Sequence, residues 1–216
     1  MILELPKLYP ITDRRLPGLT HAEQVARLCE GGARLVQLRE KRLAAREFYG
    51  EAAEALKVAR LFGARLIVND RVDVALAVGA DGVHLGQDDM PPEAARALLG
   101  EGKIVGFSTH NVEQAIEAAR LPVDYIALGP VFDTSSKENP DPVVGLEGVR
   151  RVRGAVGGGV RLVAIGGITA EGAPSVLAAG ADSVAVIGAL VNTTDPAEIT
   201  RRTHDFLARL SSGTEA

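Results

Sequence analysis

Short runs of apolar residues recur along this chain of 216 residues, and a segment with helical spacing follows each run. The runs are rich in β-branched residues and hardly alternate with polar ones, which is typical of strands buried on both faces. They occupy residues 8–11, 35–38, 65–68, 82–85, 104–107, 125–128, 162–165 and 183–187. Helices are predicted over residues 21–30, 44–61, 72–78, 91–99, 112–119, 147–153, 170–179 and 196–210.

Alternation of strand and helix predicts an all-parallel sheet covered by helices. Eight such units in 216 residues have about 27 residues each, which is enough to close a (βα)8 TIM barrel. The competing fold is a doubly wound open sheet, which needs a glycine-rich nucleotide fingerprint after the first strand. Thr12-Asp-Arg-Arg15 is not such a fingerprint. The sequence therefore favours one TIM-barrel domain over residues 1–216.

Composition excludes several classes of protein. The chain has 24 Lys and Arg against 28 Asp and Glu, and its net charge of −4 argues against a nucleic-acid partner. A single cysteine, Cys29, excludes a disulfide framework and suits the reducing cytoplasm. No apolar stretch approaches the ~20 residues that span a bilayer, and residues 1–7 lack the features of a signal peptide. We expect a cytoplasmic protein without a membrane partner.

Polar residues that directly follow parallel strands meet at one rim of a barrel, where active sites are built. Arg39 and Lys41 follow the second strand, and Lys137 lies in the long loop after the sixth. Each cation alone is compatible with a solvated surface charge. Together with the neighbouring hydroxyls of residues 134–136, they indicate a binding site for an anion.

Glycines end the last two strands, at positions 166, 167 and 188. They let backbone N–H groups approach a phosphate closely, as in the phosphate sites of many barrels. They are equally suited to forming tight turns between strand and helix.

Carboxylates form a second group at the same rim, with Asp70 after the third strand and Asp88 and Asp89 after the fourth. Two carboxylates within ~4 Å repel each other by about 4 kcal/mol at an effective dielectric of ~20, and a dication reverses that sign. Mg²⁺ suits such a site, because it completes its shell with substrate phosphates. Alternatively, these aspartates cap the helices that follow them. Metal, cations and phosphate loops together indicate a diphosphate substrate.

Motifs at successive strand ends resemble those of the thiamine phosphate synthase family over nearly the whole chain. The motifs that carry the resemblance are Leu8-Tyr-Pro-Ile-Thr-Asp13, Gln37-Leu-Arg-Glu-Lys41, Asn69-Asp-Arg71, Gly82-Val-His-Leu-Gly-Gln-Asp-Asp89, Gly129-Pro-Val-Phe132 and Ala164-Ile-Gly-Gly-Ile168. Two positions depart from the family pattern: Thr134-Ser-Ser-Lys137 replaces Thr-x-Thr-Lys, and Gly188 replaces a frequent serine.

The resemblance implies a Mg²⁺-dependent transferase that joins an aminopyrimidine-methyl diphosphate to thiazole phosphate, giving thiamine phosphate and diphosphate. It assigns the metal to Asp70 and Asp89 and contact with the pyrimidine to Ser108. The residues that it implies for the pyrimidine diphosphate are Gln37, Arg39, Lys41, Asn69 and Lys137. Those that it implies for the thiazole phosphate are Thr134, Ser135, Ser136, Gly167, Ile187 and Gly188. The catalytic groups that it implies are Arg39, Lys41 and Lys137.

A related branch, the thiazole tautomerases, shares this barrel and carries an acid/base histidine at the position of His110. Synthases also carry histidine there, so His110 does not discriminate between them. A third hypothesis is a phosphate-ligand sensor without turnover. Because only the transferase needs a cradle for metal and diphosphate, the joint presence of Lys41, Asp70, Asp89 and Lys137 favours the synthase. A homo-oligomer is compatible with the sequence.

Overall fold

The computed structural model describes residues 3–15, 18–134 and 141–212. Eight parallel strands close into a barrel in the order in which they occur along the chain, and the first pairs with the last. They are β1 (Leu8–Thr12), β2 (Leu35–Leu38), β3 (Arg65–Asn69), β4 (Gly82–Leu85), β5 (Ile104–Thr109), β6 (Tyr125–Leu128), β7 (Arg161–Ile165) and β8 (Ser183–Val186). The prediction of a (βα)8 TIM barrel is confirmed.

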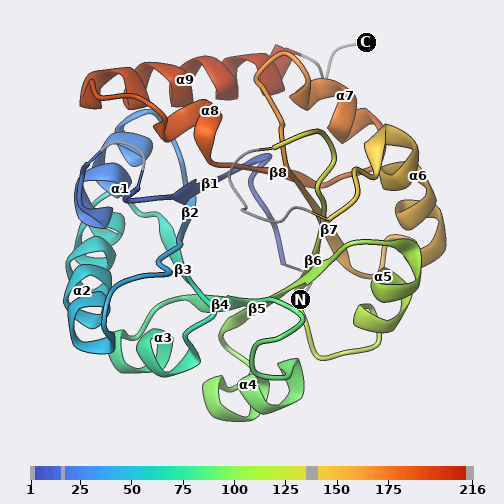
Figure 1. The fold of residues 1–216 in the computed structure, drawn as a ribbon, viewed down its shortest axis with the longest axis horizontal. Helices are drawn as coiled ribbons and strands as arrows, with labels where there is room; N and C mark the ends of the chain where they lie inside the picture. The colour runs from blue at the N-terminus through green and yellow to red at the C-terminus, as the bar shows by residue number, and fades with distance from the viewer. Residues whose placement is uncertain (1–2, 16–17, 135–140, 213–216) are drawn as a thin grey trace.

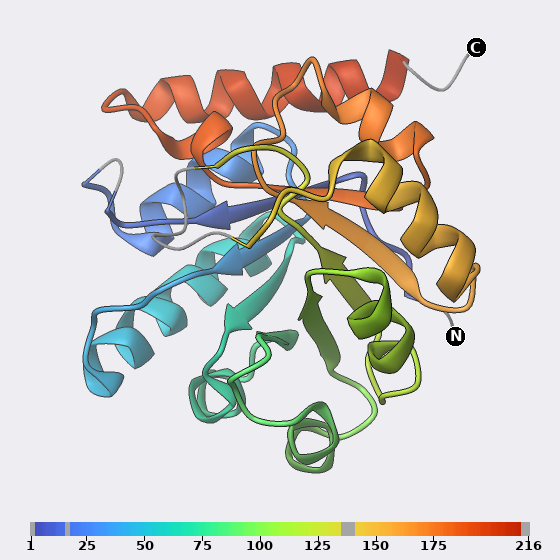
Figure 2. The same ribbon diagram turned by 45° about the vertical axis from the view of Figure 1, so that its right-hand side comes forward.

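Helices surround the barrel as an outer ring (Figure 1), and the turned view shows them outside the strands (Figure 2). They are α1 (His21–Glu30), α2 (Ala45–Leu61), α3 (Val72–Val78), α4 (Pro92–Leu99), α5 (Val112–Ala118), α6 (Gly145–Val156), α7 (Ala173–Ala178), α8 (Gly188–Val191) and α9 (Pro196–Ser212). None of the helices in the described ranges is both long and apolar enough to cross a membrane.

Three of these helices differ most from the sequence-based expectation. Helix α7 begins three residues later and ends one residue earlier than the predicted 170–179. Helix α8 has four residues and was not predicted, because it is too short to show a helical period. Helix α6 begins two residues earlier and ends three residues later than the predicted 147–153. Its extension passes through Gly154, a residue of low helix propensity, because packing of Val149 and Val152 on the barrel outweighs that preference.

The core has two layers, which explains why the strands hardly alternate. The larger layer fills the space between the strands and the helices. The smaller layer fills the barrel interior with Tyr9, Ile11, Leu35, Ile67, Ile104, Tyr125, Ala127, Val163 and Ala185. Leu3 and Leu5, which precede β1, pack against this inner layer and cover the amino-terminal end of the barrel. The carboxyl ends of the strands, here called the mouth, carry the candidate site.

An arginine clamp occurs twice at the amino-terminal end. Arg96 on α4 and Arg153 on α6 each donate to the carbonyl that ends their own helix, to a carbonyl before the next strand, and to an aspartate before the strand after it. The aspartates are Asp124 and Asp182, and each also accepts from a backbone amide of the intervening strand, at 2.7 and 2.8 Å. Each clamp therefore fastens a helix to two neighbouring strands.

Candidate active site

An ion pair between Lys41 Nζ and Asp70 Oδ2 joins the neighbouring loops after β2 and β3 at the mouth. Asp70 follows β3 directly and has a φ of 63°, a left-handed conformation that no other non-glycine residue shows in the described part of the chain. Its amide donates to the carbonyl of His84 on β4 at 2.8 Å. Backbone geometry therefore fixes where Asp70 stands.

Asp89 lies beside Asp70, in the loop after β4. Its Oδ2 accepts from the amide of Gly86 at 2.7 Å, which closes the loop on itself. Burial raises the pKa of Asp89 above its ordinary value, and the hydrogen bond and charge of the neighbouring Asp70 carboxyl raise it further. The two aspartates predicted to bind metal therefore meet. No group of three or more His, Cys, Asp or Glu able to hold a metal occurs within the described ranges.

The alternative role of these aspartates as helix caps is not realised. Helix α3 begins after Arg71 and helix α4 after Pro91, and neither cap residue makes a side-chain hydrogen bond to its helix. Asp89 instead holds its own loop through Gly86.

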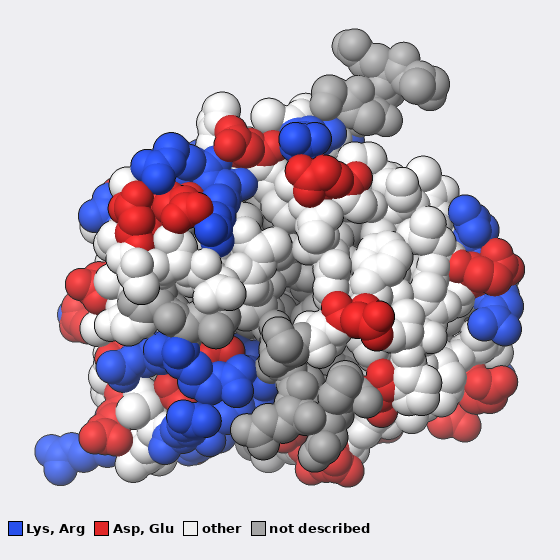
Figure 3. Space-filling model, turned by 45° about the horizontal axis from the view of Figure 1, so that its top comes forward, with Lys and Arg blue, Asp and Glu red and all other residues white. Residues whose placement is uncertain are grey.

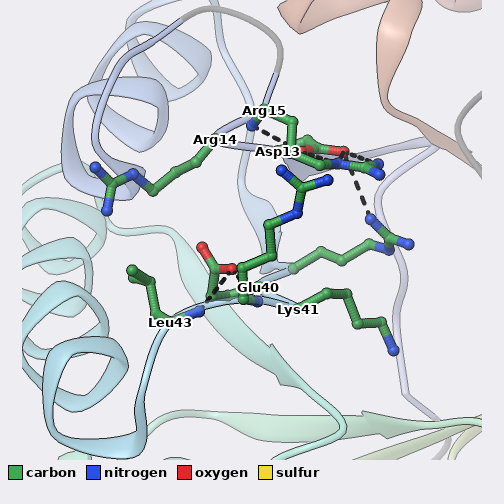
Figure 4. A pocket seen from close by; sticks show the side chains of 8 residues that line it. Asp13, Arg14, Arg15, Glu40, Lys41 and Leu43 are labelled. Atoms are coloured by element: carbon green, nitrogen blue, oxygen red, sulfur yellow. Dashed lines mark hydrogen bonds and ion pairs between the residues drawn. The ribbon is translucent and has the colours of Figure 1, made fainter.

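The loop after β2 is held in place by Glu40, which stands between Arg39 and Lys41 in the sequence. Glu40 Oε1 accepts from the backbone amides of Arg42 at 2.6 Å and Leu43 at 3.2 Å. Its Oε2 lies 3.4 Å from Nε2 of the buried His21 on α1. Figure 4 shows that Glu40 turns back toward Leu43, whereas Lys41 extends away from it. Glu40 therefore shapes the loop while its neighbour Lys41 reaches the site.

A pocket of about 220 Å³ lies beside this loop, lined by Asp13, Arg14, Arg15, Arg39, Glu40, Lys41, Arg42 and Leu43. Asp13 binds Arg15 through both carboxylate oxygens, and its Oδ2 lies 3.5 Å from Arg39 Nη1. Burial opposes ionisation of Asp13, but hydrogen bonds from Arg15 and the charges of both arginines lower its pKa below the ordinary value. Arg14 points away (Figure 4) and pairs with Glu51 on α2 at 3.1 Å.

Positive charge is concentrated locally on a chain that is acidic as a whole. Five of the eight residues that line this pocket are Lys or Arg, and they outnumber its two carboxylates. Figure 3 shows Lys and Arg side chains gathered in patches on the face that it presents. The mouth can therefore attract an anion although the chain carries a net charge of −4.

Three further predicted substrate residues lie deeper, at the carboxyl ends of β2, β3 and β5. Gln37 and Asn69 are buried, with 3% and 6% of their surface exposed, and Ser108 is half-buried. Ser108 Oγ lies 2.9 Å from His84 Nε2, and Gln37 Nε2 donates to the hydroxyl of Tyr9 at 3.1 Å. Ser108 and Gln37 therefore have fixed partners inside the barrel.

The loops predicted to bind the thiazole phosphate follow β6 and β7, and they lie side by side. The amide of Phe132 donates to the carbonyl of Gly166 at 3.0 Å. Gly167 has a φ of 63°, and a Cβ there would stand 2.4 Å from the carbonyl oxygen of Asp133. Only glycine allows this close approach of the two loops. Ser135, Ser136 and Lys137 lie outside the described residues.

Helix α8 follows β8 without a loop, and Ile187 is its cap residue and Gly188 its first. A short extra helix after the last strand is a recurring part of phosphate sites in TIM barrels. Its N-terminal amides are the groups that such a site would use.

His110 lies apart from the lysine and the two aspartates. Its Nδ1 donates to the carbonyl of Gly129 at 2.8 Å and lies 3.4 Å from Asp141 Oδ2. It lines a separate pocket of about 420 Å³ beside α5 and α6.

Sequence reasoning missed three groups at the mouth. Asp13 and Arg15 directly follow β1, so the rule that selected the other candidates would have found them. Glu40 stands between two selected cations. Its role depends on His21, which no local motif indicates.

Comparison with known proteins identifies the family. The family model described as "Thiamine monophosphate synthase" matches residues 8–190, which is most of the chain. The chain belongs to this family. The matched residues include all eight strands, Lys41 and Asp70, and the loops after β6 and β7.

Individual relatives agree with this assignment. A thiamine-phosphate synthase of Clostridium novyi is 47% identical over 190 residues, covering 88% of this chain and 92% of the relative. One of Koribacter versatilis is 48% identical over 217 aligned positions, covering 97% and 98%. Among solved structures, a thiamine phosphate pyrophosphorylase from Pyrococcus furiosus superposes with a TM-score of 0.85 at 38% identity, covering 96% of each chain. The similarity therefore extends over whole chains.

Proposed function

We propose that the chain is a transferase of thiamine biosynthesis that couples 4-amino-2-methyl-5-(diphosphomethyl)pyrimidine to thiazole phosphate, releasing diphosphate. The observation that carries the proposal is the meeting of Lys41, Asp70 and Asp89 at the mouth, beside the cationic pocket that includes Arg39. A diphosphate leaving group needs cations and a divalent metal, and this cluster can supply both. The named relatives support the same reaction.

The two aspartates fit a magnesium ion. The raised pKa of Asp89 reflects burial and the neighbouring Asp70 carboxyl, so a dication between them would relieve an unfavourable arrangement. Mg²⁺ accepts one or two protein carboxylates and takes its remaining ligands from water and phosphate oxygens. When bound to Asp70 and Asp89, the ion would supply charge neutralisation for the diphosphate.

The two substrates would occupy opposite sides of the mouth. Gln37, Arg39, Lys41, Asn69 and Ser108 would hold the pyrimidine diphosphate, with Lys137 as a further cation. Thr134, Ser135, Ser136, Gly167, Ile187 and Gly188 would hold the thiazole phosphate. Because the barrel is closed and side chains fill its interior, water would not reach the site from the amino-terminal end of the strands.

The reaction would proceed by departure of diphosphate before attack. The C–O bond of the pyrimidine methylene breaks, and its electron pair leaves with diphosphate. The thiazole nitrogen then donates its lone pair to the resulting pyrimidine-methyl cation and forms the C–N bond. Arg39 and Lys41 would stabilise the leaving oxygens, and the remaining residues would orient the two reactants. We further propose a cytoplasmic location, which the single, buried Cys29 supports.

Incubation with both phosphorylated substrates, with and without Mg²⁺, tests the proposal. We expect thiamine phosphate and diphosphate in equal amounts, and only when Mg²⁺ is present. A parallel incubation with the non-aromatic thiazole carboxylate phosphate tests the tautomerase alternative. Aromatisation of that precursor without any coupling would overturn the proposal. Binding of thiazole phosphate without turnover would indicate a sensor.

A further inference from the structure

A chain of hydrogen bonds crosses the barrel interior and connects two of the predicted substrate residues. Gln37 Nε2 donates to Tyr9 Oη at 3.1 Å, and Tyr9 Oη lies 3.0 Å from Tyr125 Oη. Tyr125 Oη lies 3.0 Å from His84 Nδ1, and His84 Nε2 lies 2.9 Å from Ser108 Oγ. Five strands contribute one residue each. The chain of bonds therefore links the carboxyl ends of β2 and β5 through the core.

These hydrogen-bonded side chains occupy space in the barrel interior that apolar side chains would otherwise fill. The two tyrosines belong to the inner apolar layer and are at most 1% exposed, and His84 is 8% exposed. Gly106 makes room for the Tyr125 ring, because a Cβ at that position would stand 2.0 Å from its Cζ. The His84 and Tyr125 rings stack with centroids 5.5 Å apart. Buried polar groups of this kind persist only when each has a partner.

The direction of donation along the chain follows from its first member. An amide nitrogen donates and does not accept, so Tyr9 accepts from Gln37. Tyr9 then has one proton, which it gives to Tyr125, and Tyr125 gives its own proton to His84. In the opposite direction the Tyr9 proton would have no acceptor among these groups, which is unfavourable in a buried site.

Neutral histidine completes the chain at the mouth. Because Nδ1 accepts from Tyr125, the proton of the ring is on Nε2, which donates to Ser108 Oγ. The Ser108 hydroxyl then has its own proton left to donate outward. With the opposite tautomer this proton would be donated to His84 Nε2, so the tautomer decides whether Ser108 has a proton available for a ligand.

We propose that Tyr9, Tyr125 and His84 are positioning residues that hold the Ser108 hydroxyl as a hydrogen-bond donor toward an unprotonated ring nitrogen of the substrate. This inference rests on the proposed function, in which a pyrimidine ring occupies that part of the mouth. A ring nitrogen has a lone pair, and a C–H group in its place has none. Tyr9, Tyr125 and His84 would therefore determine specificity through Ser108, without touching the substrate themselves.

Nitrogen NMR of the full-length, ligand-free protein tests the direction directly and requires no activity. In protein labelled with ¹⁵N-histidine, the shifts of a neutral ring show which nitrogen carries the proton, and the His84→Gln variant assigns the signals. We expect the proton of His84 on Nε2. A proton on Nδ1 would overturn the proposal.

Reversal of the first donor provides a sharper test. The Gln37→Glu variant, studied above neutral pH, places an acceptor where the amide donor stood. Every bond can then be made only in the opposite direction, so we expect the proton of His84 to move to Nδ1. Gln37→Leu is the matched control, because it removes the donor without supplying an acceptor. An unchanged tautomer in Gln37→Glu would show that the residues act independently.

Substrate analogues test the consequence for specificity. Each pyrimidine nitrogen in turn is replaced by C–H, and the KM of each analogue is compared with that of the parent diphosphate. With the wild-type protein, we expect the KM of one of the two analogues to be about tenfold higher than that of the parent diphosphate. The increase should be smaller with Tyr125→Phe or Ser108→Ala. Val163→Ala, a change in the same inner layer outside the chain of bonds, should keep the wild-type ratio.

The two proposals fail in different ways. If the protein couples no substrates but His84 carries its proton on Nε2, the proposed function fails and the direction of the hydrogen bonds stands. If coupling occurs but the two analogues behave alike, or the proton is on Nδ1, the inference about Ser108 fails and the function stands.

Discussion

Lys41 and Asp70 form an ion pair at the mouth of the barrel, between the neighbouring loops that follow β2 and β3. Asp70 also faces Asp89, whose pKa it raises. The Asp70 carboxylate is thus paired with the Lys41 ammonium and also lies close to the Asp89 carboxylate, which repels it. A dication that enters would compete with Lys41 for Asp70 and free the lysine for a phosphate oxygen.

Asp89→Asn should weaken the binding of the Mg²⁺ on which the reaction depends. The substitution keeps an oxygen that can accept from the Gly86 amide, but it removes one of two negative charges at the site. We expect the Mg²⁺ concentration for half-maximal coupling to rise about tenfold or more. Titration of activity with Mg²⁺ measures it. Asp88→Asn is the control, and a similar rise in that variant would contradict the assignment.

The same variant should be more stable than the wild type when Mg²⁺ is absent. The pKa of Asp89 is raised in the folded state, so the folded state holds this proton more tightly than the unfolded state. Ionised Asp89 therefore destabilises the fold at neutral pH, and this effect disappears as the pH falls through its raised pKa. We expect the Tm of Asp89→Asn to exceed that of the wild type at neutral pH, as thermal unfolding would measure. The difference should shrink in acid, and a lower Tm would contradict the prediction.

Lys137→Ala should slow diphosphate departure. Its position in the loop after β6 and its charge predict a contact with the leaving group, and loss of one such contact lowers kcat by about 10²–10³. Single-turnover coupling measures the loss. Lys57→Ala on α2, where the lysine is exposed and pairs with Glu54, provides the comparison. Equal rates in both variants would falsify the role of Lys137.

Stability should fall in mild acid because of His21. Burial lowers the pKa of this histidine below its ordinary value, and the charge of Glu40 opposes the shift only in part. The unfolded state therefore binds the proton more readily. Below a pH of about 6.5, His21 should contribute a loss of up to about 1.4 kcal/mol per pH unit. Urea unfolding across this range measures the slope.

The His21→Asn variant should show a flatter dependence of stability on pH. His204→Asn on α9 is the control, because His204 is exposed, with 77% of its side chain accessible. Equal slopes in the two variants and the wild type would mean that other groups cause the loss.

Gly106→Ala should be destabilising because of one contact. The new Cβ would stand 2.0 Å from Tyr125 Cζ, so the ring must move away from its hydrogen-bond partners. We expect a loss of about 1–3 kcal/mol in the free energy of unfolding. Gly154→Ala on α6 is matched to it, because no atom lies within 4 Å of the added methyl. It should raise stability by about 0.5–1 kcal/mol.

The strands were predictable because both of their faces are buried, which leaves uninterrupted apolar runs in the sequence. Three of them, at Leu35–Leu38, Gly82–Leu85 and Tyr125–Leu128, have the predicted bounds. Helix α1 also matches, and its capping box at Thr20 and Glu23 explains its sharp start. Helix α8 could not be found, because four residues carry no period.

The site was predictable as far as polar residues that directly follow parallel strands meet at one rim of the barrel. This rule selected Lys41, Asp70 and Asp89, which the structure brings together. It could not indicate that Tyr125 bonds to His84, because that pairing depends on the register of a closed barrel and on the space left by Gly106. Contacts across the interior join residues far apart in sequence and leave no local pattern.

The clamps of Arg96 and Arg153 have an architectural consequence. They repeat one set of bonds in two βαβ segments, at the end of the barrel remote from the mouth. Each segment is thus held together by its own hydrogen bonds, which do not involve the loops at the mouth. Substitutions or insertions in the loops at the mouth can therefore leave the bonds at the opposite end of the barrel intact.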